Sequence, residues 1–300
     1  MESTLPQVAA TALINISFAW VVGVLASRFW LMQQTAGWQK PVDKQLSFAM
    51  SAWLITCISG ILLSLWTESA IMGDVAWLNA GPAFAQMLTA THYGHAGAAA
   101  LAFLISALLV HLLRNGPGVS KTYLGSLTVL LLLVAAARVT IGHAYEHGPF
   151  SVAVAVEWLH LVIMAVWAGI VFVAGWLVLP RVLAGDAVLT KELTAYLTSM
   201  SNWAGAALAG ILATGAYNAY RVLGSPYQLI EVEYGQVLTF KLCLILIAIA
   251  LGGFNKFIGL PAATSHRGLR TVTTALRVES VVLLLVLIAA AVLTSSAPPG

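Results

Sequence analysis

Histidine and glutamate side chains gather in three short stretches of an otherwise apolar chain, which holds seven histidines in all. The stretch "THYGH" places His92 and His95 three residues apart, so the two rings share one face of a helix. The stretch "IGHAYEHGPF" adds His143 and His147, with Glu146 between them. Neutral imidazole is the commonest metal ligand, and spacings of three or four along a helix let two rings converge on one ion. These residues predict a metal site.

The third stretch, "VEWLHLVIMAVWAG", combines a carboxylate with an imidazole. Glu157, His160, Met164 and Trp167 advance by three, four and three, so they form a stripe on one helix face. An ionisable group at membrane depth is costly unless it is paired, solvated or ligated. Glu157 and His160 are therefore predicted to belong to a functional site. Met164 either fills space or offers a thioether to Cu(I).

Other charged residues in apolar stretches offer a structural explanation for Glu157. Lys241 and Arg138 are expected at a similar depth, and either is a candidate ion-pair partner. Glu279 and Arg277, in the last apolar stretch, can neutralise each other or pair with Lys241. No chemistry is assigned to this last pair.

The donor types favour copper. The predicted cluster contains no cysteine, which leaves imidazole, thioether and carboxylate donors, a set that suits Cu(I) or Cu(II). Haem iron is the alternative, because imidazoles from two facing helices, such as those of His95 and His160, can supply both axial ligands. A single interfacial histidine, such as His92 or His147, also serves readily as a hydrogen-bonded anchor. Cys57 and Cys243 are far apart in apolar stretches, and no disulfide is expected.

The elements that position these residues are predicted to be transmembrane helices. The chain of 300 residues is 60% hydrophobic and 8% charged, with a mean hydropathy of +0.91, which excludes a soluble domain. The net charge of +3 gives no indication of nucleic-acid binding, and the first apolar run is taken as a span rather than a removable signal. We predict an all-α polytopic membrane protein with eight transmembrane helices. Their ranges are 6–31, 46–66, 85–113, 121–142, 151–180, 196–220, 234–257 and 269–294.

Lysine and arginine are distributed unevenly between the predicted loops. Ten of them follow spans one, three, five and seven, whereas the opposite loops hold Arg221 and several acidic residues. By the positive-inside rule both termini face outward, and the histidine cluster lies on the outer half of the third, fourth and fifth spans.

The sequence also suggests an internal duplication. "MSAWLITCISGIL" from Met50 matches "MSNWAGAALAGIL" from Met200, and "THYGH" matches "VEYGQ". Trp20 and Gly23 likewise resemble Trp167 and Gly169. We predict two parallel four-helix repeats, 1–145 and 146–300, related by an axis along the membrane normal. Close helix packing through small residues explains part of the match.

Met50 and Met200 begin corresponding spans near the predicted inner surface. As a hypothesis, they form a softer exit site for Cu(I); filling of space in the core is the alternative.

The chain resembles the copper resistance protein D (CopD) family of bacterial inner-membrane proteins. The resemblance rests on "GHA" at 142–144, "EWLH" and "AVWAG" within 157–169, "YGQVLTFKL" at 234–242 and "LRVESVV" at 276–282. It implies copper uptake towards the cytoplasm. His143 and His160 are then the foremost copper residues, with Glu157 beside them, and His92 and His95 match less closely. A small periplasmic copper-binding protein is the expected partner in trans.

Three functions remain open from the sequence. The first is an inner-membrane copper transporter with both termini in the periplasm. The second is a haem-binding membrane oxidoreductase, and the third is a scaffold that presents copper without transporting it. No ATP-binding or other catalytic motif is found, and an enzyme is not expected.

Overall fold

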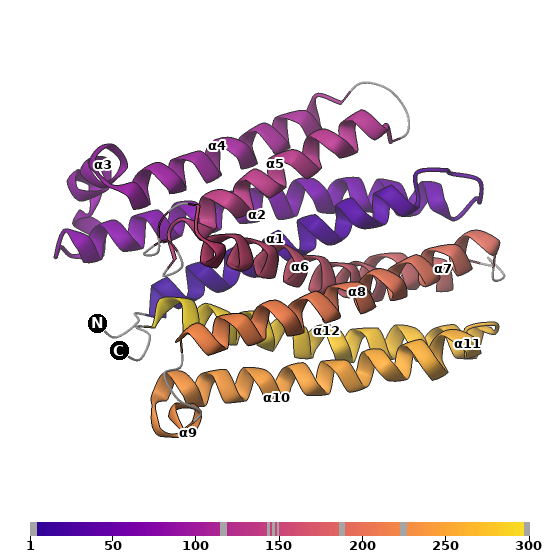
Figure 1. Cartoon of the computed structure of the whole chain (residues 1–300). Coiled ribbons are helices and arrows are strands. Elements are labelled where there is room, and N and C mark those ends of the chain that lie inside the picture. Colours follow the sequence, from indigo (N-terminus) through magenta and orange to yellow (C-terminus); the bar gives the residue numbers. More distant parts are fainter. Residues whose placement is uncertain are drawn as a thin grey trace.

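The computed structural model describes residues 5–114, 119–142, 145, 148, 150–185, 190–222 and 227–296. In these residues the chain forms a bundle of long helices that run side by side, with both termini at one end (Figure 1). Within the described ranges, seven helical segments are long and apolar enough to cross a membrane, which confirms a polytopic, all-helical membrane protein. They are α1 (Leu5–Trp30), α2 (Gln39–Met72), α4 (His92–Leu112), α5 (Lys121–Val139), the segment Val152–Leu183, the segment Glu233–Ala262 and α12 (His266–Ser295).

The predicted count of eight spans is not reached by this measure. The remaining predicted span, 196–220, lies within α8 (Lys191–Val222), which has 32 residues and packs against α6 (Val152–Val173). Its length is sufficient, but it carries serine, threonine, asparagine and glycine at many positions. These residues lower its hydropathy below that of the other seven segments.

The predicted third span, 85–113, is broken in two. A short helix, α3 (Gly81–Ala90), ends at Thr91, whose backbone is extended (φ −118°, ψ 148°). The Thr91 hydroxyl then accepts a hydrogen bond from the Gly94 backbone N–H and caps α4. In the same way α9 (Gln228–Glu231) ends at Val232 (φ −108°, ψ 146°), directly before α10 (Glu233–Phe254).

Two of the long segments contain a π-helical turn. In the first, α6 continues through η3 (Ala174–Val178) into α7 (Leu179–Leu183), and in the second, α10 continues through η4 (Asn255–Gly259) into α11 (Leu260–Ala262). Pro180 and Pro261 are the second residues after these turns. Proline has no N–H and collides with the carbonyl four residues earlier, which accounts for the local change in helix winding.

The centre of the bundle is formed by α1, which packs against α2, α6 and α12. Gly23 and Gly169 meet where α1 crosses α6, since a Cβ atom on Gly23 would overlap the carbonyl oxygen of Gly169. A Cβ atom on Gly169 would likewise overlap the carbonyl oxygen of Ala19. These glycines allow two backbones to approach closely, as small residues commonly do between membrane helices.

The two ends of the bundle differ in charge. The end that holds the termini, called the terminal end below, also carries α3 and α9 (Figure 1). At the opposite end, called the basic end, α1, α4, α7 and α11 end, and α2, α5, α8 and α12 begin (Figure 1). Its basic residues are Arg28, Lys40, Lys44, Arg114, Lys121, Arg181, Lys191, Lys256, Arg267 and Arg270.

Candidate functional site

The two ionisable residues of α6 contact two polar residues of α8. The Nδ1 atom of His160 lies 2.8 Å from the Thr214 hydroxyl, and the Nδ2 atom of Asn218 donates to the Glu157 carboxylate at 2.6 Å. Glu157 and His160 are three residues apart on α6, and Asn218 and Thr214 are four apart on α8. Each pair lies on one helix face, so both contacts form at once. Gly215 lies beside the ring, since a Cβ atom there would be in ordinary contact with His160 at 3.5 Å. The interface between α6 and α8 is therefore polar at this level.

The hydrogen bonds of Thr214 determine the tautomer of a neutral His160. The Thr214 hydroxyl donates its only proton to the Gly210 carbonyl at 2.7 Å, because a carbonyl oxygen can only accept. Its oxygen must then accept from the Nδ1–H of His160. The lone pair of a neutral His160 therefore lies on Nε2, for which the described part of the chain supplies no hydrogen-bond partner. A ring held by one nitrogen, with the other free, is the arrangement in which histidine binds metals.

Further polar atoms surround this pair. The Oδ1 atom of Asn218 is buried without a hydrogen-bond partner. Lys241 of α10 interacts electrostatically with Glu157, and so does Arg138 of α5, whose guanidinium donates to Asn15 at 2.7 Å. Both predicted charge partners of Glu157 thus act on it through space, without an ion pair inside 4 Å in the described residues.

The C-terminal half of the predicted α6 stripe, Met164 and Trp167, belongs to the core. Met164 is 6% exposed and Trp167 is 2% exposed, and both lie in the apolar cluster of the bundle. The Trp167 indole lies within hydrogen-bonding reach of Glu279 on α12. The four residues of the stripe thus separate into a polar pair that faces α8 and a buried pair deeper in the bundle.

His92 and His95 are exposed at the start of α4, and each already has a partner in the backbone. The Nε2 atom of His92 donates to the Thr140 carbonyl at 3.1 Å, and its ring stacks on Tyr145 with 4.3 Å between centroids. The Nε2 atom of His95 donates to the Thr89 carbonyl at 3.2 Å. Both contacts fit hydrogen-bonded anchors, and they do not use the Nδ1 lone pair that a neutral ring would offer to a metal.

The other members of the predicted cluster, His143, Glu146 and His147, lie outside the described residues. Within the described residues, no group of three or more histidine, cysteine, aspartate or glutamate side chains is arranged to hold a metal ion. A copper site with three protein ligands therefore requires a donor from outside the described residues, or a methionine as one of the three ligands.

Met50 and Met200 lie in the apolar core, 0% and 4% exposed. This burial agrees with the space-filling alternative.

The basic end holds a polar network that the sequence did not reveal. Arg28 is 0% exposed, and its Nε atom pairs with Asp43 at 3.0 Å while its Nη1 atom donates to the Tyr123 hydroxyl at 3.1 Å. That hydroxyl lies 2.7 Å from Nδ1 of His111, whose Nε2 atom donates to the Ser47 carbonyl at 3.0 Å. The chain of bonds joins α1, α2, α4 and α5. We interpret this network as structural, because both ring nitrogens of His111 and the hydroxyl of Tyr123 already form hydrogen bonds within it.

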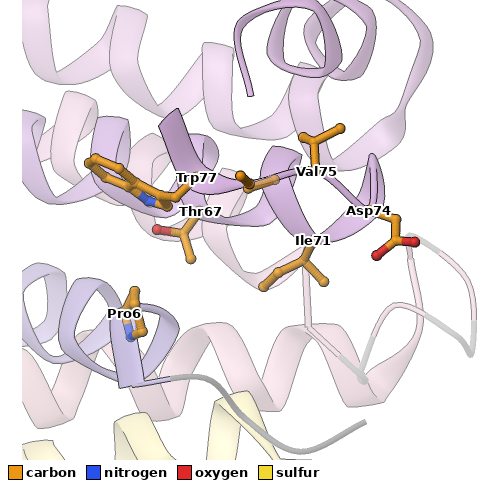
Figure 2. A pocket seen from close by; sticks show the side chains of 8 residues that line it. Pro6, Thr67, Ile71, Asp74, Val75 and Trp77 are labelled. Atoms are coloured by element: carbon orange, nitrogen blue, oxygen red, sulfur yellow. The ribbon is translucent and has the colours of Figure 1, made fainter. Parts of the chain in front are cut away.

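A hollow of about 530 Å³ lies at the terminal end between the start of α1 and the turn after α2. Figure 2 shows its walls, with Thr67 and Trp77 facing Pro6, and Asp74 at the far side. It contains none of the predicted metal-binding residues.

Fold and contacts together define a multi-pass helical membrane protein with a partly buried histidine and carboxylate pair between two helices. Residues 194–293 match the family model of copper resistance protein D (CopD). This match confirms the family resemblance predicted from the sequence, and it indicates a role in copper resistance or transport. No curated protein and no solved structure matches the chain.

The matched segment runs from the first turn of α8 almost to the end of α12. It contains Thr214, Asn218 and Lys241, the residues that contact or electrostatically face the α6 pair. The sequence analysis missed Thr214 and Asn218. Their spacing of four in "TGAYN", on a helix of low hydropathy, is a signal that could have identified them.

Proposed function

We propose that this protein is a copper transporter of the bacterial inner membrane, in which His160 and Glu157 form the intramembrane copper-binding pair. The observation that carries the proposal is the His160–Thr214 bond, which leaves the Nε2 lone pair of neutral His160 free. The match to the copper resistance protein D family supplies the choice of metal. Copper is the cargo, so both residues are assigned to binding and neither to catalysis.

Each neighbour of His160 has a separate role in this proposal. Thr214 fixes the ring orientation through Nδ1, and Glu157 compensates the charge of the ion. Asn218 holds the Glu157 carboxylate at 2.6 Å and has a buried, unpartnered oxygen beside it. Met164 and Trp167 line the buried continuation of the same face.

Copper enters, in this proposal, from the periplasmic side at the terminal end. The concentration of basic residues at the opposite end supports this orientation through the positive-inside rule. His92, which stacks on Tyr145, borders the segment that carries His143 and His147 in the sequence, and these three histidines form the capture site. A small periplasmic copper-binding protein in trans delivers the ion. From His160 the ion moves towards the cytoplasm.

We further propose that α8 is the eighth span and that residues 1–145 and 146–300 are two parallel repeats. Equivalent local structures support the duplication. A Cβ atom on Gly94 would overlap the carbonyl oxygen of Met87, and a Cβ atom on Gly235 would overlap that of Gln228. In both cases a short helix folds back on a glycine in the first turn of the next helix.

The test measures copper bound per purified protein for the wild type, His160→Ala and His266→Ala in the same detergent. His266 is exposed at the start of α12 and serves as the matched control. We expect bound copper to be lost in His160→Ala and retained in His266→Ala. Equal copper in all three proteins, or none in any, contradicts the proposal.

Two further measurements separate the alternatives. Thr214→Val keeps the side-chain shape but removes the acceptor for Nδ1–H, and we expect copper affinity to fall about 10- to 100-fold. A Soret absorption band in purified protein would instead indicate the haem oxidoreductase. Copper binding without uptake into proteoliposomes would indicate the scaffold.

A further inference from the structure

A second carboxylate, Glu279 of α12, is buried near the middle of the bundle and takes no part in the proposed copper site. Glu279 is 2% exposed. Its surroundings are Asn255 of η4, Trp167 of α6 and Gly252 of α10, which are all uncharged. A buried carboxylate is costly when it is ionised without a cationic partner.

The nearest arginine in sequence does not neutralise Glu279. Arg277 lies two residues earlier, about 200° around the helix, so it faces a different neighbour. Its Nε atom donates to the Gly175 carbonyl at 3.0 Å, and its guanidinium lies 4.9 Å from the Trp176 ring. Trp176 in turn donates to Ser280 at 2.8 Å. The η3 turn thus fixes the rotation of α12 and directs Glu279 towards η4.

Asn255, which faces Glu279, has an unused acceptor. It is 4% exposed, and its Nδ2 atom donates to Glu279 Oε2 at 3.3 Å. Its Oδ1 atom is buried and has no hydrogen-bond partner. A Cβ atom on Gly252 would lie 3.3 Å from the Glu279 carboxyl group, and a Cβ atom on Gly259 would lie 3.2 Å from Asn255 Oδ1. Glycine at these positions leaves space for both polar side chains.

The same residue pairing occurs at Glu157 with a different electrostatic environment. Asn218 donates to Glu157 at 2.6 Å, and Lys241, Arg221 and Arg138 all act on that carboxylate. A short bond is typical of an ionised acceptor. The bond to Glu279 is longer, at 3.3 Å, and no charged residue acts on that carboxyl group.

We propose that Glu279 and Asn255 form an intramembrane proton-binding site, in which Glu279 is protonated in this conformation. Binding forms one O–H bond on the Glu279 carboxylate and changes no oxidation state. The carboxylic acid gains the donor that the carboxylate lacks, and Asn255 Oδ1 is an acceptor on the side chain already bonded to it. An acid and an amide can then exchange two hydrogen bonds, which removes both the buried charge and the unsatisfied acceptor.

The site lies beside a π-helical turn, a feature that is often found at functional positions in helices. Asn255 is the first residue of η4, so a change in the winding of this turn would move Asn255 relative to α12. The proton site thus has an element that can move, next to a helix that η3 holds in place.

The test is infrared spectroscopy of the full chain at neutral pH, where exposed carboxylates are ionised. We expect a carbonyl-stretching band of a protonated carboxylic acid that disappears in Glu279→Gln and persists in Glu157→Gln. Absence of this band in the wild type, or its persistence in Glu279→Gln, overturns the proposal. Glutamine can exchange two hydrogen bonds with Asn255 as the protonated acid does, so this variant is expected to fold.

Asn255→Leu provides a second readout that leaves Glu279 in place. With the amide removed, the carbonyl band is expected to shift to higher frequency, because the acid loses its hydrogen-bonded partner. An unchanged band excludes Asn255 from the site and overturns the proposal. Matching circular dichroism spectra of both variants and the wild type establish that the fold is retained.

A link between this proton and copper movement rests on the proposed transport function. In proteoliposomes we expect a pH gradient to change the rate of copper uptake by the wild type but not by Glu279→Gln, which cannot exchange a proton. An equal response in the two proteins contradicts the coupling. If the wild type takes up no copper but shows the infrared band, the proposed function fails while the proton site stands.

Discussion

His95 of α4 and Gln236 of α10 make the same hydrogen bond at equivalent places. In each case the Nε2 atom contacts the carbonyl oxygen six residues earlier. His95 contacts Thr89 at 3.2 Å, and Gln236 contacts Ile230 at 3.0 Å. Since a carbonyl can only accept, His95 donates through Nε2–H, as the glutamine amide does. This hydrogen bond therefore requires a donor at the position of His95, and a glutamine amide supplies one at the equivalent position.

The first prediction concerns this equivalence. His95→Gln is expected to retain copper binding and thermal stability, because glutamine makes the same bond in the other half of the chain. His95→Ala removes the bond and is expected to cost about 1 kcal/mol. Unfolding midpoints and copper content, measured on both variants in one detergent, provide the check. Loss of copper in His95→Gln would instead identify this ring as a ligand.

The sequence was a good guide to helices and a poorer guide to the site. The apolar runs predicted a polytopic helical protein, since length and hydropathy decide whether a helix can cross a membrane. The count of eight was less secure because α8 combines a spanning length with many polar residues. Those polar residues include Thr214 and Asn218, which contact the α6 pair. The polar residues that weakened the span prediction are therefore the ones that contact His160 and Glu157.

Side-chain partners could not be predicted from spacing alone. Periodicity placed Glu157 and Trp167 on one face, but a long helix contacts different neighbours along its length, and these two residues face α8 and α12. Arg277 and Glu279 are close in sequence, yet they point to different elements. The motifs also gave no indication that His111 would be joined to Tyr123 in a network at the basic end.

The second prediction tests the crossing of α1 and α6. Gly23→Ala places a methyl group where the Gly169 carbonyl lies, so the helices must separate. We expect a loss of about 1–3 kcal/mol in stability, as for other overpacked cores. Gly125→Ala is the control, because nothing lies within 4 Å of a Cβ atom there. Equal unfolding midpoints for the two variants would mean that the crossing is more open than described.

The third prediction addresses the network at the basic end. Tyr123→Phe removes the hydroxyl that accepts from Arg28 and contacts His111, leaving two buried nitrogen atoms without that partner. The expected cost is about 1–3 kcal/mol. Tyr220→Phe, at a site that is 85% exposed, is expected to be neutral. Thermal unfolding of the two variants in parallel makes the comparison, and a neutral Tyr123→Phe would show that the hydroxyl is dispensable.

The fourth prediction decides between the two interpretations of Met50 and Met200. Both side chains are buried in the apolar core, where leucine has nearly the same volume. The double variant Met50→Leu, Met200→Leu is therefore expected to fold at a cost below about 1.5 kcal/mol for each site. If the thioethers only fill space, copper uptake by proteoliposomes remains at the wild-type rate.

A softer exit site for Cu(I) gives a different outcome in the same variant. Copper would still bind at the His160 pair, because neither methionine contributes to it, but release on the far side would slow and uptake would fall. Copper content and uptake are therefore measured together on one preparation. Full copper content with lost uptake would establish the exit site, whereas full content with normal uptake would leave the two methionines as core residues alone.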